Sequence, residues 1–407
     1  MTESTSLTRR CYPAAQMLRV LTLSTLYPDA TRPNFGVFVE RQTRGLAAHP
    51  DVDLTVVAGL GIPPWPLSVH PNYRRFAALP AQQCWNGVSV HRPRFTILPG
   101  IGGRFHAAAL ARAAARIVDP LHAKRPFDVI DAEFFFPDGP AAIALGARYG
   151  IPVSIKARGA DIHHWGRNPA TAAQVRDAAC QADGLLAVSE ALAGDIAALG
   201  VERDDIAVHR TGIDRALFAV RDRAAAKSAL GIAGPLVVSL GALIERKGHA
   251  IVVDAVASLP GVSLAIAGEG PARASLEARI AASGAADRIR LLGSIPHAEL
   301  PRWMNAADVM ALASSSEGLA NAWVEALASG TPIVIPDAGG AREIVTTPAA
   351  GRIVDRQAGA FASAIAELIA DPAPPADTAD TVSAYSWETN RDRLYAHLAR
   401  LAESRAA

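Results

Sequence analysis

Short apolar runs alternate with amphipathic segments along almost the whole chain. In the first half, the apolar runs predict strands at 18–24, 53–58, 88–91, 127–131, 153–157 and 184–188. The intervening segments have the spacing of helices and predict them at 36–48, 105–118, 139–149, 171–181 and 190–199. This alternation is typical of βαβ units and predicts a parallel, doubly wound sheet.

The same pattern starts again in the second half of the chain. Strand-like runs recur at 236–240, 263–267, 289–292, 308–313, 333–335 and 351–354. We therefore predict an α/β protein with two facing Rossmann-like domains, whose boundary lies between 206 and 235. Because ligands bind at the carboxyl ends of parallel strands, the cleft between the two domains is the expected site.

The pattern also predicts domain limits. We assign 17–208 to an N-terminal domain and 209–375 to a C-terminal domain. Residues 1–16 are polar, lack the apolar core of a secretory signal and are expected to be a disordered extension. Residues 376–407 follow a proline-rich break and predict an amphipathic helix that packs back on the N-terminal domain.

Composition and charge narrow the class of protein. A chain of 407 residues with 50% apolar residues has enough core material for two globular domains. The formal net charge of +1 argues against a nucleic-acid partner. The three cysteines lack the spacing of a disulfide framework or a zinc site, which favours a cytoplasmic protein. No apolar run reaches the about 18 residues of a membrane span.

Two adjacent cations follow the first strand predicted in the second half. The segment GALIERKG begins at Gly241 and places Arg246 and Lys247 at the carboxyl edge of the predicted sheet. Arginine binds a diphosphate as a bidentate fork, and lysine binds it as a point charge. A solvated pair of surface charges is the alternative.

Two glutamates, Glu317 and Glu325, lie eight residues apart after a later strand. Eight helical residues rise about 12 Å, which is comparable to the reach from a hexose across a pyrophosphate to a ribose. Carboxylates at these positions suit sugar hydroxyls, while the backbone amides of Gly318, Leu319 and Ala320 are placed to face phosphates. Glutamates at this spacing are also common on ordinary helix surfaces.

Two glycine turns are further anion-site candidates. Gly36 follows the first predicted strand and opens a helix, where free N–H groups and the helix dipole favour an anion, with a tight turn as an equal alternative. The segment GIGGRF at 100–105 has Phe105 where a dinucleotide fingerprint requires its third glycine, and this favours a plain turn.

Together these segments resemble the retaining glycosyltransferases of family 4, which have the GT-B fold. The resemblance extends from about Leu18 to about Leu398 and rests on LYPDATRPNFGVFVERQ, VSEALAGDIAALGV, HRTGID, GALIERKGH, AGEGP, LLGSIPHAELPRWMNAADV, EGLANAWVEALASGTPIV and AGGAREIV. It implies transfer of a sugar, with retention, from a nucleotide diphosphate sugar to a hydroxyl of a glycan or lipid-linked glycan. Cell-surface or exopolysaccharide synthesis is the implied setting.

The resemblance assigns roles to the charged candidates. Arg246 and Lys247 would bind the donor diphosphate and offset charge on the leaving group. Glu325 would hold the ribose diol, and Glu317 would contact hydroxyls of the donor sugar.

The resemblance also gives backbone roles to small residues. Gly318, Leu319 and Ala320 would present amides to the donor, and Gly36 would close a loop around the reaction centre. Gly241 and Gly268 would belong to the donor-binding loops. No cofactor or metal is expected, because the cations and the helix N-terminus replace it.

The chain departs from the family at two places. Glu133 lies where members often carry a histidine close to the donor sugar, which suggests a sugar- or acceptor-binding role for this glutamate. Arg158 and Asp161 belong to a segment where a Thr-x-His-Asp-like run is common, and we expect both to face the cleft.

Three other groups of residues carry weaker signals. The run at 163–165, His-His-Trp, lacks complementary metal ligands and favours a loop. Asp51 and Asp53 match an Asp-x-Asp motif but precede a strand. Three arginines on roughly one face of the helix at 105–118 suggest peripheral contact with anionic lipid, and these are Arg104, Arg112 and Arg116. An ordinary solvated helix face is the alternative.

Two rival functions stay open. The first is other GT-B chemistry, such as a sugar-nucleotide epimerase or a phosphorylase. The second is a non-catalytic, two-lobed sugar-binding protein of the periplasmic type. No G-x-S-x-G elbow or Walker loop supports a hydrolase or a P-loop NTPase.

Overall fold

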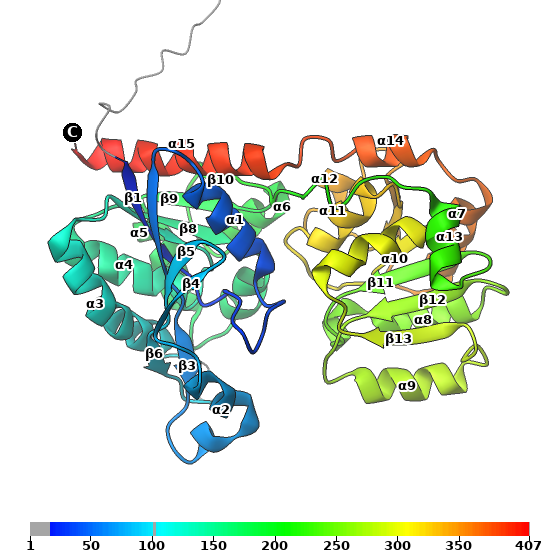
Figure 1. Cartoon of the computed structure of the whole chain (residues 1–407), viewed down its shortest axis with the longest axis horizontal. Coiled ribbons are helices and arrows are strands. Elements are labelled where there is room, and N and C mark those ends of the chain that lie inside the picture. Colours follow the sequence, from blue (N-terminus) through cyan, green and yellow to red (C-terminus); the bar gives the residue numbers. More distant parts are fainter. Residues whose placement is uncertain (1–16, 101–102, 407) are drawn as a thin grey trace, which may run out of the picture.

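The computed structural model describes residues 17–100 and 103–406, which form two α/β lobes joined by two crossings of the chain (Figure 1). The extension expected at 1–16 lies outside the described residues. Each lobe contains one large, mainly parallel sheet with helices on its faces, so the predicted α/β fold with two Rossmann-like units is confirmed. No helix among the described residues is long and apolar enough to cross a membrane.

The N-terminal lobe is built on an eight-stranded sheet in the order β10-β9-β8-β7-β1-β2-β5-β4. Its strands are β1 (Leu18–Leu23), β2 (Val52–Val57), β4 (Gln82–Trp85), β5 (Val88–His91), β7 (Val129–Ala132), β8 (Val153–Ala157), β9 (Gly184–Ala187) and β10 (Ile206–Val208). Neighbouring strands are parallel except that β4 runs antiparallel to β5. Burial on both faces explains why the parallel strands read as nearly continuous apolar runs.

Helices cover both faces of this sheet. They are α1 (Val37–Ala47), α3 (His106–Lys124), α4 (Asp138–Tyr149), α5 (Ala172–Gln181), α6 (Glu190–Ala197) and the single π-helical turn η2 (Asp161–Trp165). The pattern predicted a helix that ends at 118, whereas α3 continues through Pro120 to Lys124. Leu121 packs against the core beyond the proline, so tertiary contacts outweigh the local preference for a break.

A small projection that the pattern did not predict follows β2. It contains the two-stranded sheet of β3 (Leu60–Ile62) and β6 (Arg94–Thr96), the short helix η1 (Leu67–Val69) and α2 (Pro71–Ala77). It extends from the lower end of the N-terminal lobe in Figure 1 and has its own small core of Leu60, Phe76 and Leu79.

The C-terminal lobe contains a six-stranded, wholly parallel sheet in the order β13-β12-β11-β14-β15-β16. Its strands are β11 (Leu236–Leu240), β12 (Ser263–Ala267), β13 (Ile289–Gly293), β14 (Val309–Ala311), β15 (Ile333–Ile335) and β16 (Gly351–Ile353). Its helices are α7 (Arg223–Leu230), η3 (Glu245–Lys247), α8 (His249–Ala257), α9 (Arg273–Ala282), η4 (His297–Glu299), α10 (Leu300–Ala306), α11 (Asn321–Ala328), α12 (Ala341–Ile344), α13 (Ala358–Ala370) and α14 (Pro375–Asp380).

The last helix, α15 (Trp387–Ala406), returns to the N-terminal lobe and runs along its upper side in Figure 1. Leu394 and Leu398 are fully buried in the cluster that contains Leu18 of β1. His397 of α15 also lies 3.0 Å from Ser154 Oγ of β8 through Nε2. The N-terminal lobe is therefore completed by residues from both ends of the described chain.

Candidate active site

The strand order of the C-terminal lobe reverses between β11 and β14, and the loops after these two strands diverge there. In open α/β sheets such a switch point opens a crevice at the carboxyl ends of the strands. A cavity of about 400 Å³ lies at this place. The N-terminal lobe closes its other side with Phe38, Arg158 and Thr211.

The loop after β11 supplies two cations to this cavity. Arg246 and Lys247 lie on the single turn η3, and Gly248 reverses the chain into α8 with a φ of 67°. A side chain at Gly248 would collide with the carbonyl group of Ala313, so the turn requires glycine. The cations are therefore fixed beside the loop that follows β14.

Both predicted glycines of the adjoining loops support this geometry. Gly241 lines the cavity and packs beneath the aliphatic stem of Lys247. Gly268 does not line the cavity, because it lies against the carbonyl group of Gly241 so closely that a Cβ atom would not fit. The missing side chain of Gly268 allows the loops after β11 and β12 to pack together.

Glu317 binds both cations. Its Oε1 atom lies 2.5 Å from Lys247 Nζ, and its Oε2 atom lies 3.8 Å from Arg246 Nη1. The guanidinium group of Arg246 also donates to the carbonyl group of Ser316. The side chains of Glu317 and Lys247 are 10% and 15% exposed, so this pair is largely desolvated, whereas the side chain of Arg246 is 37% exposed.

Gly318, Leu319 and Ala320 continue this wall up to the start of α11. The carbonyl group of Gly318 accepts hydrogen bonds from Ser189 Oγ at 3.1 Å and from the amide of Gly340 at 2.8 Å. No side chain caps the N-terminus of α11. Ala320, Asn321 and Ala322 line the cavity, so the partial positive charge of the helix start lies beside it.

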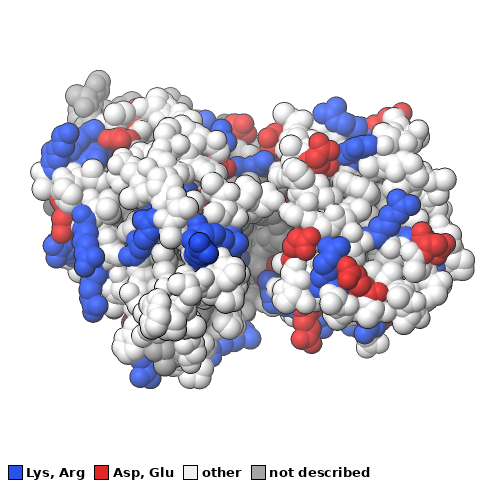
Figure 2. Space-filling view, turned by 60° about the horizontal axis from the view of Figure 1, so that its bottom comes forward, with Lys and Arg blue, Asp and Glu red and all other residues white. Residues whose placement is uncertain are grey.

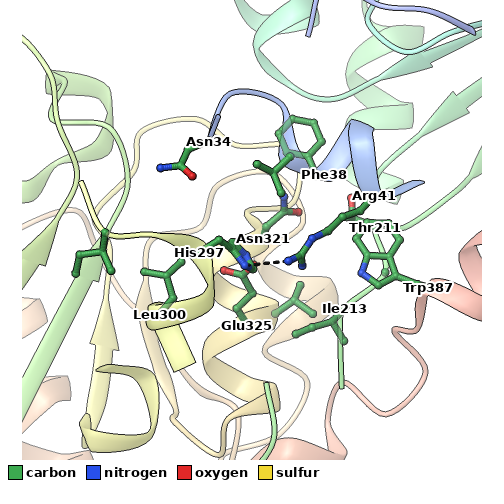
Figure 3. Close-up of a pocket in the computed structure, with 14 residues that line it drawn as sticks. Asn34, Phe38, Arg41, Thr211, Ile213, His297, Leu300, Asn321, Glu325 and Trp387 are labelled. Atoms are coloured by element: carbon green, nitrogen blue, oxygen red, sulfur yellow. Dashed lines mark hydrogen bonds and ion pairs between the residues drawn. The ribbon is translucent and has the colours of Figure 1, made fainter. Parts of the chain in front are cut away.

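The second glutamate, Glu325, lies on α11 and joins a chain of hydrogen bonds that crosses the cleft (Figure 3). Its Oε1 atom is 2.7 Å from His297 Nε2, and His297 Nδ1 is 3.1 Å from Arg41 Nη2 of the opposite lobe. Glu325 separates the first cavity from a second one of about 250 Å³. Aliphatic and aromatic groups line most of this second cavity, among them Phe38, Ile213, Ile295, Leu300, Val324 and Trp387.

Gly36 lies just outside both cavities. It is the N-cap of α1 with a φ of 70°, and its backbone lies against Leu26, where a Cβ atom would not fit. Its neighbours Asn34 and Phe38 do line the second cavity. Gly36 thus shapes the loop that reaches the cleft.

The structure corrects the expected position of Asp161. This residue is fully buried and does not face the cleft. Its carboxylate accepts hydrogen bonds from the backbone amides of Phe135, Arg158 and Gly159, at 2.8 to 3.2 Å. Burial raises its pKa, and the backbone hydrogen bonds oppose that rise. The side chain therefore fixes the loop that carries Arg158.

Glu133 is also buried and lines neither cavity, contrary to the expected cleft-lining position. One carboxylate oxygen accepts from Gln42 Nε2, and the other pairs with Arg158 Nη2. Burial acts to raise the pKa of Glu133, but Arg158 and Lys156 outweigh it and lower the pKa. Of the three residues expected at this part of the cleft, only Arg158 lines it.

The pair of Glu133 and Arg158 belongs to a buried polar network below the cleft. Lys156 Nζ lies 2.5 Å from Gln42 Oε1 and 2.5 Å from His209 Nδ1. Burial, followed by the charge of Arg158, lowers the pKa of Lys156 to about 7. His209 Nε2 donates to the carbonyl group of Asn390 at 2.8 Å, which ties the network to α15.

The sequence pattern did not identify several residues that reach the cavities. Arg41 and His297 meet across the cleft although 256 positions separate them. His163, which we assigned to a loop, lies in η2 and lines neither cavity. Its Nδ1 atom is 2.5 Å from Ser316 Oγ, and its Nε2 atom is 2.8 Å from Asp195 Oδ2. No local motif marks such residues, because their neighbours come from distant segments.

The remaining candidates lie elsewhere. Asp53 forms ion pairs with Arg19 and Arg125, at 3.0 and 2.8 Å, away from the cavities. The arginines considered for lipid contact are all exposed, and these are Arg104, Arg112 and Arg116.

Two family models match the chain. The model of Glycosyltransferase Family 4 matches residues 36–217, and the model of Glycosyl transferases group 1 matches residues 220–385. The two matches meet in the first crossing between the lobes.

Full-length relatives agree with these matches. TuaC of Bacillus subtilis, assigned by its name to teichuronic acid biosynthesis as a glycosyltransferase, is 26% identical over 381 residues, which are 90% of this chain and 94% of TuaC. The solved structure of sucrose-phosphate synthase from Thermosynechococcus elongatus has a TM-score of 0.80 at 19% identity. The superposition covers 95% of this chain and 100% of the synthase chain.

Anabaena HepE in complex with UDP-glucose has a TM-score of 0.71 at 20% identity, over 94% of this chain and 100% of its own. At these identities the two solved structures establish the fold. With both halves matched by family models and TuaC similar over nearly its full length, the chain belongs to the GT-B glycosyltransferases of group 1 and family 4, and it is a glycosyltransferase.

Proposed function

We propose that the protein transfers a sugar from a nucleoside diphosphate sugar to a hydroxyl group of an acceptor, with retention at the anomeric carbon. The observation that carries this proposal is the arrangement of Arg246, Lys247 and the uncapped start of α11 around one cavity, with Glu325 at its far side. Cations and free N–H groups at a helix start bind a diphosphate, and a carboxylate binds a diol.

The donor lies across both cavities in this proposal. Its diphosphate contacts Arg246, Lys247 and the first amides of α11, and its ribose diol contacts Glu325. The largely apolar second cavity beyond Glu325 then receives the base. HepE, of similar fold, has been solved in complex with UDP-glucose, and this supports a nucleotide sugar as donor.

Glu317 contacts hydroxyl groups of the donor sugar in this proposal. The carboxylate is held by Lys247 and Arg246, which places it beside the expected position of the diphosphate. As the bond from the anomeric carbon to the diphosphate oxygen breaks, the two cations stabilise the growing negative charge. Charge compensation by arginine and lysine supports a reaction without a divalent metal, and full activity in excess EDTA is the expected result.

Retention follows when the acceptor attacks from the face that the diphosphate leaves. The acceptor oxygen bonds to the anomeric carbon, and its proton passes to the departing diphosphate, so that no protein nucleophile is assigned. The proposal predicts that donor and product have the same anomeric configuration. An NMR spectrum of the first product that shows inversion would contradict it.

The proposed acceptor is a glycan or a lipid-linked glycan in the synthesis of a cell-surface polysaccharide. The similarity to TuaC supports this class. We include a peripheral contact with anionic lipid, made by the exposed arginines in α3 and by Arg104 just before it. Vesicle flotation of the R104E/R112E/R116E variant tests this contact, and unchanged binding would refute it.

One experiment separates the proposed function from its rivals. A thermal-shift screen of UDP-, GDP- and ADP-sugars identifies the donor, because a ligand at about 100 times its Kd stabilises a protein by about 2.7 kcal/mol. With that donor and a glycan acceptor, we expect nucleoside diphosphate release in step with glycosylation. An epimerase or phosphorylase would give other products, and a binding protein would give none.

A further inference from the structure

The projection of the N-terminal lobe exposes large apolar side chains at its end. Trp65 is 80% exposed, Leu67 is 50% exposed and Val69 is 60% exposed. We call these three residues the apolar tip. They account for half of the six large hydrophobic residues that are exposed among the described residues. Their concentration within five positions marks a surface suited to an apolar partner.

The apolar tip is presented by an ordered substructure. Phe76 and Leu79 are buried together with Leu60 in the core of the projection. Arg94 holds the end of α2 by donating to the carbonyl group of Leu79 at 2.6 Å, and Arg32 stacks over Phe76 at 4.6 Å. The exposed side chains are therefore carried outward on a folded support.

The segment that contains the apolar tip carries positive charge without acidic residues to balance it. No aspartate or glutamate occurs between Asp53 and Asp119, whereas this stretch contains seven arginines in a chain whose net charge is +1. Arg74 and Arg75 follow the apolar tip on α2, and both are exposed. A surface that combines apolar side chains with unbalanced positive charge is complementary to anionic lipid.

Several other surface arginines are neutralised by carboxylates. Arg279 pairs with Asp254 at 2.6 Å, and Arg342 pairs with Asp337 at 2.7 Å. In the part of the chain that the structure describes, neither Arg74 nor Arg75 forms an ion pair. On the face shown in Figure 2, blue predominates on the N-terminal lobe, whereas blue is interspersed with red on the C-terminal lobe.

We propose that the apolar tip inserts into the interfacial region of a membrane containing anionic lipids, while Arg74 and Arg75 bind the headgroups. Tryptophan is the residue that concentrates at the membrane–water interface, and arginine binds phosphate by forked hydrogen bonds. A soluble polyanion would be bound by the arginines but would gain little from Leu67 and Val69. The surface lies outside both cavities, so it extends the proposed membrane contact without depending on the transfer reaction.

The test measures partitioning of the full-length protein onto phosphatidylcholine vesicles, without or with about 30% phosphatidylglycerol. We expect binding to the anionic vesicles and weak binding to the neutral ones. The W65S/L67S/V69S variant is expected to bind anionic vesicles at least about tenfold more weakly. The R74Q/R75Q variant is expected to bind anionic vesicles about twentyfold more weakly. Its binding to neutral vesicles is expected to change little.

Matched variants control for loss of folding and of surface charge. The V220S and R221Q/R290Q variants remove an exposed apolar side chain and two exposed, unpaired arginines from the C-terminal part of the described chain, and both are expected to bind like the unmodified protein. All variants are expected to unfold thermally within a few degrees of it. Brominated lipid is expected to quench part of the tryptophan fluorescence, and W65F is expected to remove that quenching.

Three outcomes would overturn the proposal. One is unchanged vesicle binding by W65S/L67S/V69S. Another is loss of binding in the R104E/R112E/R116E variant but in no variant of the projection, which would place the membrane contact on α3 and the segment just before it. The third is binding to heparin but not to vesicles, which would identify a site for soluble polyanions. None of these results bears on sugar transfer, which is assayed separately with donor and acceptor in solution.

Discussion

Lys247 Nζ lies 2.5 Å from Glu317 Oε1, so the cation proposed to bind phosphate is joined directly to the carboxylate proposed to bind sugar. The two residues come from loops 70 positions apart, and the switch point between β11 and β14 brings them together. Each side chain is largely buried, which strengthens the interaction between them. They are therefore expected to function as a pair.

Replacement of either member of this pair is expected to abolish transfer. Lys247→Ala removes charge from the leaving group, and Glu317→Ala removes the contact to the donor sugar. We expect kcat/KM to fall by at least about 100-fold to 1000-fold, the range for loss of one stabilising group. Steady-state assays measure this fall, with circular dichroism to verify the fold. Glu277→Ala, at an exposed glutamate of α9, is the control, and full activity in either test variant would refute the site.

Loss of the carboxylate at Glu325 is expected to affect donor binding rather than the chemical step. A hydrogen bond to a charged group contributes about 1.5–3 kcal/mol, so Glu325→Gln is expected to raise the donor KM by about 10-fold to 100-fold. The value of kcat is expected to change little. Glu299→Gln, on the same side of the cleft but exposed, is expected to leave KM unchanged. A fall in kcat alone would contradict the ribose assignment.

The buried pair of Glu133 and Arg158 is expected to matter for stability. Removing one partner of a buried ion pair costs about 3–5 kcal/mol, because the other charge stays buried without compensation. Glu133→Leu is therefore expected to lower the free energy of unfolding in urea by about this amount. The double variant Glu133→Leu/Arg158→Leu is expected to lose less than the sum of the two single variants. Additive losses would show that the pair is not coupled.

Acid is expected to destabilise the protein through His249. Burial lowers the pKa of this histidine to about 4 from its ordinary value of 6.5, so the unfolded chain binds more protons between these pH values. The contribution of neutral His249 to the free energy of unfolding is fully present above pH 6.5 and is lost as the pH falls toward 4. The loss amounts to about 3 kcal/mol in the free energy of unfolding.

The measurement compares urea unfolding of the unmodified protein and of His249→Gln across this pH range. The variant is expected to show a shallower fall in stability, by up to one proton in the pH slope. Asp138 makes the protein more stable as the pH falls, because burial raises the pKa of its carboxyl group to about 8. Both proteins contain Asp138, so the comparison with the variant cancels its contribution. Equal slopes in both proteins would disprove the role of His249.

The periodicity of the chain was sufficient to predict the parallel sheets and the two lobes. It did not predict the projection with β3, β6 and α2, whose short strands and proline-rich turns have no strong period. It also placed the end of α3 too early, at 118, because the packing of Leu121 beyond Pro120 is not a local property.

For the site, the sequence by itself determined which charged groups follow β11 and β14, because strand ends are read from local pattern. Arg246, Lys247, Glu317 and Glu325 were found in this way. Only the tertiary structure decided which groups meet. Glu133 and Asp161 are buried, and Arg41 reaches His297 across the cleft. Burial and long-range pairing depend on how separate segments pack, and a one-dimensional pattern does not contain that information.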